Sequence, residues 1–227
     1  MKKQDIKYIK DKHKGFTRLK RSCFTIGFFG NKGEGKTFVM ALLGLIFKQQ
    51  GFIIFSNINL SYNHVRINNI KDFNKIYDYD INTNKLFIGD DFERNFNSRL
   101  FRSDLNVALN EILIDWGKIN CSCLYSSKRN QIIDIGLRDT TDQFWYISKK
   151  LMYHSDYFNI NDYLDFYQII IQRFDCNLNP LSTFSLSNLP LYKNLYETQE
   201  IVNKFSQSGH SLRKNEKHFL TKKGFFK

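Results

Sequence analysis

Eight consecutive residues form a pattern whose chemistry is phosphate binding. The segment reads G-x-x-x-x-G-K-T and directly follows a short apolar run, residues 23–29. Glycines let backbone N–H groups turn inward around phosphate oxygens, the lysine reaches the β- and γ-phosphates, and the threonine hydroxyl ligates Mg²⁺. The pattern therefore predicts a site for ATP and Mg²⁺, in which the lysine also serves catalysis. Its residues are Gly30, Asn31, Lys32, Gly33, Glu34, Gly35, Lys36 and Thr37.

A second group of chemistry-bearing residues closes an apolar run further along the chain. Residues 86–91 read LFIGDD, so two carboxylates follow a predicted buried strand. A carboxylate at such a strand end is placed to hold Mg²⁺ or its water shell, and a neighbouring one can deprotonate an attacking water. We expect Asp90 to bind the metal and Asp91 to be the general base. Glu93 is the reserve candidate for the base, because Asp91 is one methylene shorter than the usual Glu.

Two further positions have both a functional and a structural interpretation. Ser126 and Ser127 end a predicted strand, where Ser127 would sense the γ-phosphate or position water, or simply cap the strand. Arg138 precedes the next predicted strand, where it would act as an arginine finger on a neighbouring subunit's nucleotide. The structural alternative for Arg138 is a salt bridge to one of the nearby aspartates. These aspartates are Asp134, Asp139 and Asp142; the weaker finger candidates are Lys118, Arg99 and Arg102.

The spacing of apolar residues predicts the elements that position these groups. Short apolar runs predict strands at 23–29, 52–55, 85–89, 119–125 and 143–148, and helical spacing predicts helices at 37–50, 70–77 and 103–116. Strands that alternate with helices predict a mostly parallel sheet covered on both faces. The expected fold is an α/β P-loop NTPase (RecA/ASCE-like), a three-layer sandwich. After residue 150 the pattern changes, with one or two strands at 163–174 and a helix at 198–205.

The positive charge is concentrated at the two ends of the chain. The formal net charge is +12; residues 1–21 hold nine bases and two acids (+7), and residues 213–227 hold six bases and one acid (+5). The 191 residues between them are neutral, with 19 bases and 19 acids. Basic arms of this kind suit a polyanion such as nucleic acid, and solubilising tails are the equally weighted alternative. We therefore divide the chain into an N-terminal arm (1–21), an ATPase core (22–150), an elaboration packed on the core (151–212) and a basic tail (213–227).

The cysteines and the hydropathy predict a cytoplasmic protein. Cys121 and Cys123 have one residue between them, which is neither a zinc spacing nor a redox pair, and both lie with Cys23 in apolar runs. We expect buried, reduced thiols and hence a reducing compartment. No stretch approaches the roughly 18 apolar residues that a membrane span needs. The basic N-terminus has no apolar region after it, so it is not expected to be a signal peptide.

Several segments taken together resemble a known superfamily. In chain order they are GNKGEGKT, FIIFSNINL, LFIGDD, CLYSS and IIDIGLRDTTDQFW, spread over residues 23–150. This order resembles the FtsK–HerA superfamily of ring-forming DNA-pumping ATPases. The compact size is most like the genome-packaging ATPases of membrane-containing and archaeal viruses, and it is similar to the zonula-occludens-toxin-like assembly ATPases of filamentous phages. Two positions depart from the pattern: Asp91 stands where the family has Glu, and Ser127 where it has Gln.

The resemblance implies a homo-oligomer, commonly a hexameric ring, that threads double-stranded DNA. The leading hypothesis is a viral DNA translocase that packages a genome at a capsid or membrane vertex, either in the host cytoplasm or on the virion. The second hypothesis is an assembly or export ATPase that moves a protein and would work without DNA. The third is a nucleotide-switched DNA-binding protein that hydrolyses ATP poorly, which the Asp90-Asp91 departure keeps open. No helix-turn-helix pattern, which this third class would need, is evident in residues 151–227.

Overall fold

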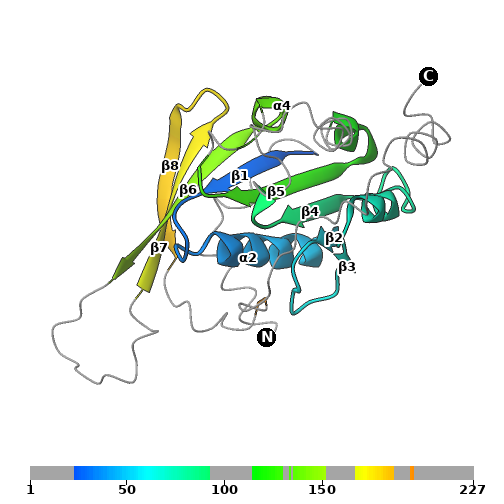
Figure 1. Ribbon diagram of the computed structural model, residues 1–227, viewed down its shortest axis with the longest axis horizontal. Coiled ribbons are helices and arrows are strands. Elements are labelled where there is room, and N and C mark those ends of the chain that lie inside the picture. Colours follow the sequence, from blue (N-terminus) through cyan, green and yellow to red (C-terminus); the bar gives the residue numbers. More distant parts are fainter. Residues whose placement is uncertain are drawn as a thin grey trace, which may run out of the picture.

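The architecture is an eight-stranded sheet with helical elements on both faces (Figure 1). The computed structural model describes residues 23–92, 114–129, 133, 135–151, 167–186 and 195–196. The predicted arms, Glu93, Arg99, Arg102, Asp134 and the predicted helix at 198–205 lie outside these residues. Of the helix expected at 103–116 only the last three residues are described, and they are helical.

The strands confirm the α/β P-loop class expected from the sequence. In chain order they are β1 (Thr25–Phe29), β2 (Ile53–Ser56), β3 (Val65–Arg66), β4 (Lys85–Gly89), β5 (Cys121–Ser127), β6 (Gln143–Leu151), β7 (Tyr167–Asp175) and β8 (Pro180–Leu186). The spatial order is β3-β2-β4-β5-β1-β6-β7-β8. Strands β1 to β6 run parallel, whereas β7 and β8 are antiparallel to their neighbours. Strand β5 therefore lies between β1 and β4.

The helical elements divide into two layers. Helix α2 (Lys36–Gln49) packs on one face of the sheet, where side chains such as Val39 and Leu43 meet Phe28, Ile88 and Leu124. On the other face lie the 3-10 helix η1 (Ile70–Ile76), the 3-10 turn η4 (Gly117–Ile119) and the short helix α4 (Ile135–Asp139) (Figure 1). The expected helix at 70–77 is therefore a 3-10 helix, which Asn69 and Asp72 close with a capping box.

The C-terminal strands continue the core sheet. Strand β6 extends through Leu151 and pairs over nine residues with β7, which pairs with β8. Strand β8 was not expected from the sequence, because its exposed, polar residues and Pro180 do not form an apolar run. An edge strand tolerates such residues, since one side has no ladder to satisfy. The boundary predicted at residue 150 falls inside β6, and the other domain boundaries stay predictions.

The buried surroundings of the cysteines agree with the thiols expected from the sequence. Cys121 and Cys123 are fully buried in β5, and burial raises the pKa of both thiols. Cys23 is half-buried, and its Sγ donates a hydrogen bond to the carbonyl of Cys121. All four cysteines are free, and only Cys176 is exposed. No helix in the described ranges is long and apolar enough to cross a membrane.

Candidate functional site

The phosphate loop connects the end of β1 to the start of α2. Gly30, Gly33 and Gly35 have φ values of +147°, +85° and +96°, which an L-residue with a side chain rarely adopts. These conformations fold the loop over its own lysine. The Lys36 ammonium donates hydrogen bonds to the carbonyls of Gly30 at 2.7 Å and Asn31 at 2.9 Å. Lys36 is therefore held, largely buried, inside the loop where a phosphate chain would enter.

The N-terminus of α2 has no capping side chain from its own N-cap residue. Gly35 is the N-cap residue and provides no side-chain hydrogen bond, and the first turn contains no acidic residue. The positive end of a helix dipole favours an anion, and helix N-termini commonly bind phosphate groups. The sequence thus places a favourable potential where Lys36 and Thr37 begin the helix.

Asp90 is tied to the loop and to a neighbouring strand through its carboxylate. It follows the end of β4, and the hydroxyl of Thr37 donates a 2.9 Å hydrogen bond to its Oδ2. The hydroxyl of Ser126, in β5, donates a 2.5 Å hydrogen bond to its Oδ1. Burial raises the pKa of Asp90 above its ordinary value, and nearby Asp91 adds to this, whereas the two hydroxyl bonds act in the opposite direction. The site therefore contains a desolvated carboxylate that a cation would stabilise.

The backbone of Asp90 is fixed by a second contact, from the end of β2. The Asn57 side-chain amide donates to the Asp90 carbonyl at 2.9 Å and accepts from the Asp90 N–H at 2.8 Å. Asn57 is only 3% exposed. Sequence reasoning noted this residue within FIIFSNINL but gave it no role. The sequence could have indicated this role, because Asn57 directly follows a predicted strand. An Asn amide can both donate to and accept from the backbone at the end of a neighbouring strand.

Asp91 forms the turn that ends β4. Its φ of +49° is unusual for a non-glycine residue, and its N–H donates to the hydroxyl of Ser126 at 2.9 Å. The backbone of Asp91 is thus held by the same serine that contacts the Asp90 carboxylate. Its role as a general base stays a prediction.

The contact between Thr37 and Asp90 fits a magnesium ion. Mg²⁺ binds oxygens at about 2.0–2.1 Å in an octahedron, so two adjacent ligand oxygens lie about 2.9 Å apart. Thr37 Oγ1 and Asp90 Oδ2 lie 2.9 Å apart, which is also the ordinary length of the hydrogen bond between them. No cluster of three or more His, Cys, Asp or Glu side chains occurs within the described ranges. Mg²⁺ is commonly held by one or two carboxylates together with phosphates and water.

The two serines of β5 have different surroundings. Ser126 contacts Asp90, whereas the hydroxyl of Ser127 donates to the carbonyl of Arg129 at 3.1 Å. Both are fully buried. Ser126 continues the face of β5 that Leu124 presents to α2, and Ser127 continues the opposite face with Tyr125. The sequence-based assignment singled out Ser127, although strand alternation already places Ser126 on the side of Asp90.

Arg138 lies on α4, on the face of the sheet opposite α2. Helix α4 leads into the start of β6, where Asp142 N–H bonds the carbonyl of Thr25 at the N-terminal end of β1. The phosphate loop follows the other end of β1. The buried Nε of Arg138 has no hydrogen-bond partner within the part of the chain that the structure describes. The structure thus does not bring Arg138 to the loop of its own chain, and action on a neighbouring subunit stays a prediction. Lys118, the weaker candidate, forms a 2.6 Å ion pair with Asp115.

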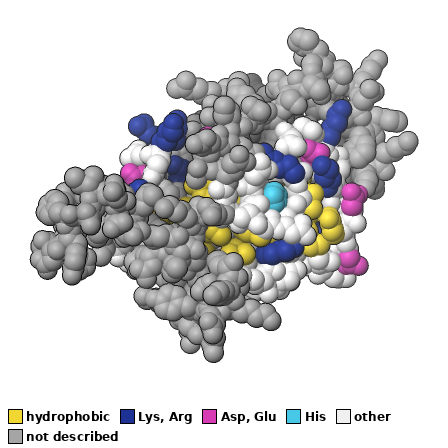
Figure 2. Space-filling view, turned by 90° about the horizontal axis from the view of Figure 1, so that it is seen from below, with side chains coloured by type: hydrophobic (Ala, Val, Ile, Leu, Met, Phe, Trp, Pro, Cys, Tyr) yellow, Lys and Arg dark blue, Asp and Glu magenta, His cyan; other side chains and the backbone are white. Residues whose placement is uncertain are grey.

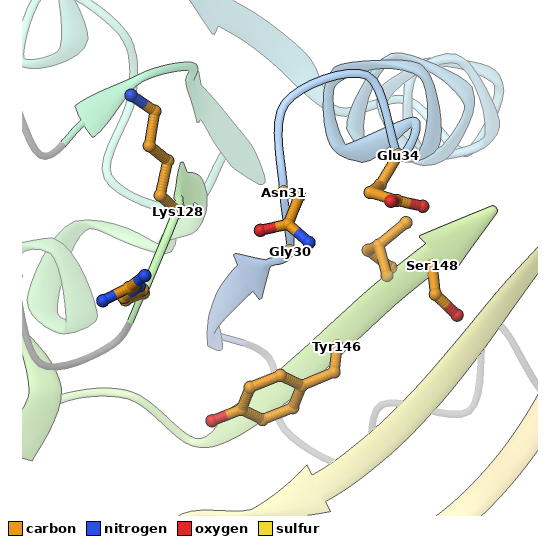
Figure 3. Close-up of a pocket in the computed structure, with 8 residues that line it drawn as sticks. Gly30, Asn31, Glu34, Lys128, Tyr146 and Ser148 are labelled. Carbon is orange, nitrogen blue, oxygen red and sulfur yellow. The ribbon is translucent and has the colours of Figure 1, made fainter.

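An open pocket of about 310 Å³ lies beside the loop. Figure 3 shows Lys128, from the end of β5, on one side of the loop and Tyr146 and Ser148, from β6, on the other. Lys128 and Arg129 bring positive charge to this pocket, and sequence reasoning did not select them. Their position immediately after a strand tip was the available signal. The lining residues are Gly30, Asn31, Glu34, Lys128, Arg129, Tyr146, Ile147 and Ser148.

Comparison with solved structures finds three chains that are similar to this one. The N-terminal domain of zonular occludens toxin from Neisseria meningitidis is 15% identical, with a TM-score of 0.51, over 77% of this chain and 99% of that domain. The genome packaging NTPase B204 from Sulfolobus turreted icosahedral virus 2, in complex with AMPPCP, is 12% identical, with a TM-score of 0.49, over 73% and 97% of the two chains. The DNA-packaging ATPase B204 from Sulfolobus turreted icosahedral virus is 13% identical, with a TM-score of 0.47, over 71% and 96%.

No family model and no curated protein matches this sequence. At 15% identity the likeness to the toxin domain, whose TM-score is 0.51, shows the fold alone. Together with the strand order and the phosphate loop, it establishes the α/β fold of P-loop NTPases, the class to which the resemblance seen in the sequence pointed.

Proposed function

We propose that this chain is a Mg²⁺-dependent ATPase. The observation that carries the proposal is the position of Asp90, which hydrogen bonds to Thr37 of the phosphate loop and to Ser126 of β5. A buried acid beside the loop threonine is an arrangement that binds Mg²⁺ and a nucleoside triphosphate. The same arrangement has no evident structural purpose, because burying the carboxylate disfavours its charged form.

Each residue of the site has a separate role in ATP hydrolysis. The loop N–H groups and Lys36 bind the phosphates, and Thr37 and Asp90 hold Mg²⁺, which supplies charge neutralisation at the transferring phosphoryl group. Asp91 accepts the proton of the attacking water. Arg138 acts on the nucleotide of the adjacent subunit in a homo-oligomer. Ser127 senses the γ-phosphate or positions the attacking water.

We propose further that ATP hydrolysis by this protein translocates double-stranded DNA during genome packaging. The support is the charge distribution: +7 and +5 in the two terminal arms against a neutral body. On the described part of the face in Figure 2, Lys and Arg side chains lie in several separate places and do not form one continuous stripe. By sequence, the arms are the most basic segments of the chain, which suits contact with a phosphate backbone. A hexameric ring, attached to a capsid or membrane vertex and working in the host cytoplasm, would complete such a motor.

Transport of a protein is the second candidate function. It is favoured by the sequence resemblance to the zonula-occludens-toxin-like assembly ATPases of filamentous phages. An export ATPase would use the same phosphate loop and the same Asp90. The two candidates differ in whether DNA accelerates ATP hydrolysis and in whether the protein associates with membranes. A nucleotide-switched DNA-binding protein would bind ATP with negligible hydrolysis.

The deciding experiment is ATP hydrolysis by the purified full chain, with and without double-stranded DNA at low salt. Lys36→Ala is the control that removes the loop ammonium. We expect hydrolysis that DNA stimulates and that Lys36→Ala abolishes. DNA-independent hydrolysis would contradict the translocase and favour the export ATPase. Tight ATP binding without hydrolysis, on or off DNA, would show that Asp91 is not a working base.

A further inference from the structure

The phosphate loop rests on a part of β6 that extends beyond its neighbour β1. Strand β1 ends at Phe29, which pairs with Tyr146, whereas β6 continues to Leu151. The loop, which begins at Gly30, runs beside this extension. Strand β7 lies on its other side and pairs Ile169 with Lys149. The loop is therefore in contact with the antiparallel pair β6–β7, an addition to the parallel part of the sheet.

Three contacts join the loop to this strand pair. The N–H of Lys149 donates a hydrogen bond to the carboxylate of Glu34. A Cβ on Gly30 would overlap the carbonyl oxygen of Ile147, so the backbones approach closely there. A Cβ on Gly35 would meet the Cδ1 of Ile169 at 2.6 Å. Of these three contacts, only the Glu34 hydrogen bond is made by a side chain of the loop, because the other two are close approaches at glycines.

The presence of Glu34 needs a reason, because a carboxylate in this loop lies beside the site of a polyanion. A carboxylate close to the bound phosphates would weaken ATP binding by repulsion. Glu34 therefore needs another role that offsets this loss of affinity. Its acceptor oxygen is used on the backbone of β6. Glu34 is half-buried, and Figure 3 shows its side chain on the side of the pocket where Ser148 lies.

We propose that Glu34 is a positioning residue, which fixes the phosphate loop against β6 in the conformation that receives the triphosphate. This inference rests on the proposed function, since the ligand is the ATP of that site. Glu34 acts through the loop and does not touch the phosphates. Its contribution depends on the reach and the acceptor oxygen of the side chain, whereas its negative charge is unfavourable for the ligand.

Two conservative variants of Glu34 separate the effect of its side-chain length from the effect of its negative charge. Glu34→Gln keeps the length and an acceptor oxygen but removes the charge, and Glu34→Asp keeps the charge but is one methylene shorter. If Glu34 positions the loop, the Glu34→Gln variant binds Mg²⁺–AMPPCP as well as wild type or better. The Glu34→Asp variant binds about fivefold more weakly, as expected for loss of an ordinary hydrogen bond. If only the charge matters, Asp resembles wild type. Weaker binding by Gln, or wild-type binding by Asp, would overturn the proposal.

A second measurement does not depend on nucleotide. Hydrogen exchange of the nucleotide-free protein, read on peptides that cover 30–36 and 147–151, reports whether the loop stays on β6. We expect faster exchange in both peptides for Glu34→Asp and unchanged exchange for Glu34→Gln. Unchanged exchange in Glu34→Asp would contradict the positioning role.

The two measurements also separate this inference from the proposed function. A wild-type protein that binds no nucleotide, but shows the expected exchange difference, would contradict the ATPase proposal and leave the loop contact established. Lys150→Ala, on the exposed part of the same strand, is the matched control and should change neither measurement.

Discussion

Replacement of Ser126 by alanine tests the central network of the site. Its hydroxyl donates to the Asp90 carboxylate at 2.5 Å and accepts the N–H of Asp91 at 2.9 Å. The serine is fully buried in β5, so water cannot replace either partner without entering the core. The variant removes one oxygen atom and leaves a buried acceptor and a buried donor without the partner that the serine supplied.

The expected loss of stability follows from these two bonds. A hydrogen bond to a charged group contributes about 1.5–3 kcal/mol and a neutral one about 1 kcal/mol, so Ser126→Ala should cost roughly 2–4 kcal/mol. For a chain of 150–250 residues each kcal/mol shifts the melting temperature by about 2–4 °C, which gives a decrease of roughly 5–15 °C. Ser127→Ala is the matched control, since that hydroxyl donates to the carbonyl of Arg129, a neutral acceptor. It should cost about 1 kcal/mol.

The pH dependence separates the two serines. The Ser126 hydroxyl lowers the pKa of Asp90, so its removal raises the folded-state pKa further above the unfolded value. A carboxylate with a raised folded-state pKa stabilises the fold only while it is protonated, and this stability is lost as pH rises through the interval between the two values. The cost of Ser126→Ala should therefore be larger at about pH 8 than at about pH 4, and that of Ser127→Ala should be the same at both. Urea denaturation at the two pH values measures this. Equal, pH-independent costs for the two variants would refute the network.

Three further variants test other parts of the structure. Asp90→Asn removes the buried charge, so the nucleotide-free protein should melt at a higher temperature than wild type at about pH 8, with a smaller gain near pH 4, while Mg²⁺-dependent ATP binding is lost; a lower melting temperature at pH 8 would contradict this. Lys85→Met should cost roughly 2–4 kcal/mol in urea denaturation, because the fully buried ammonium donates to the carbonyls of Asp80, Thr83 and Ile119; a cost below about 1 kcal/mol would show that those carbonyls find other partners. Arg138→Ala should bind ATP normally but fail to hydrolyse it, and wild-type turnover in that variant would remove the arginine-finger assignment.

The parallel core was predictable from the sequence because its elements are encoded locally. Buried strands such as β1 and β4 read as short apolar runs, and α2 reads as a helical pattern that glycines bound on both sides. The 3-10 geometry of η1 and the polar edge strand β8 were not predictable in this way. Apolar spacing predicts a helix at 70–77 but does not separate a 3-10 helix from an α-helix, and β8 exposes most of its side chains.

The sequence by itself determined the chemistry of the phosphate loop and the acidic residues after β4, because glycines, lysine, threonine and aspartate in that spacing have few other uses. Only the tertiary structure decided which side chains meet Asp90. Ser126 and Asn57 are 36 and 33 positions away from it along the chain, and the order and register of β2, β4 and β5 bring them together. The contact of Glu34 with β6 spans 115 positions and depends on β6 extending past the end of β1. Such contacts depend on how the strands align across the sheet, and local sequence patterns do not encode that alignment.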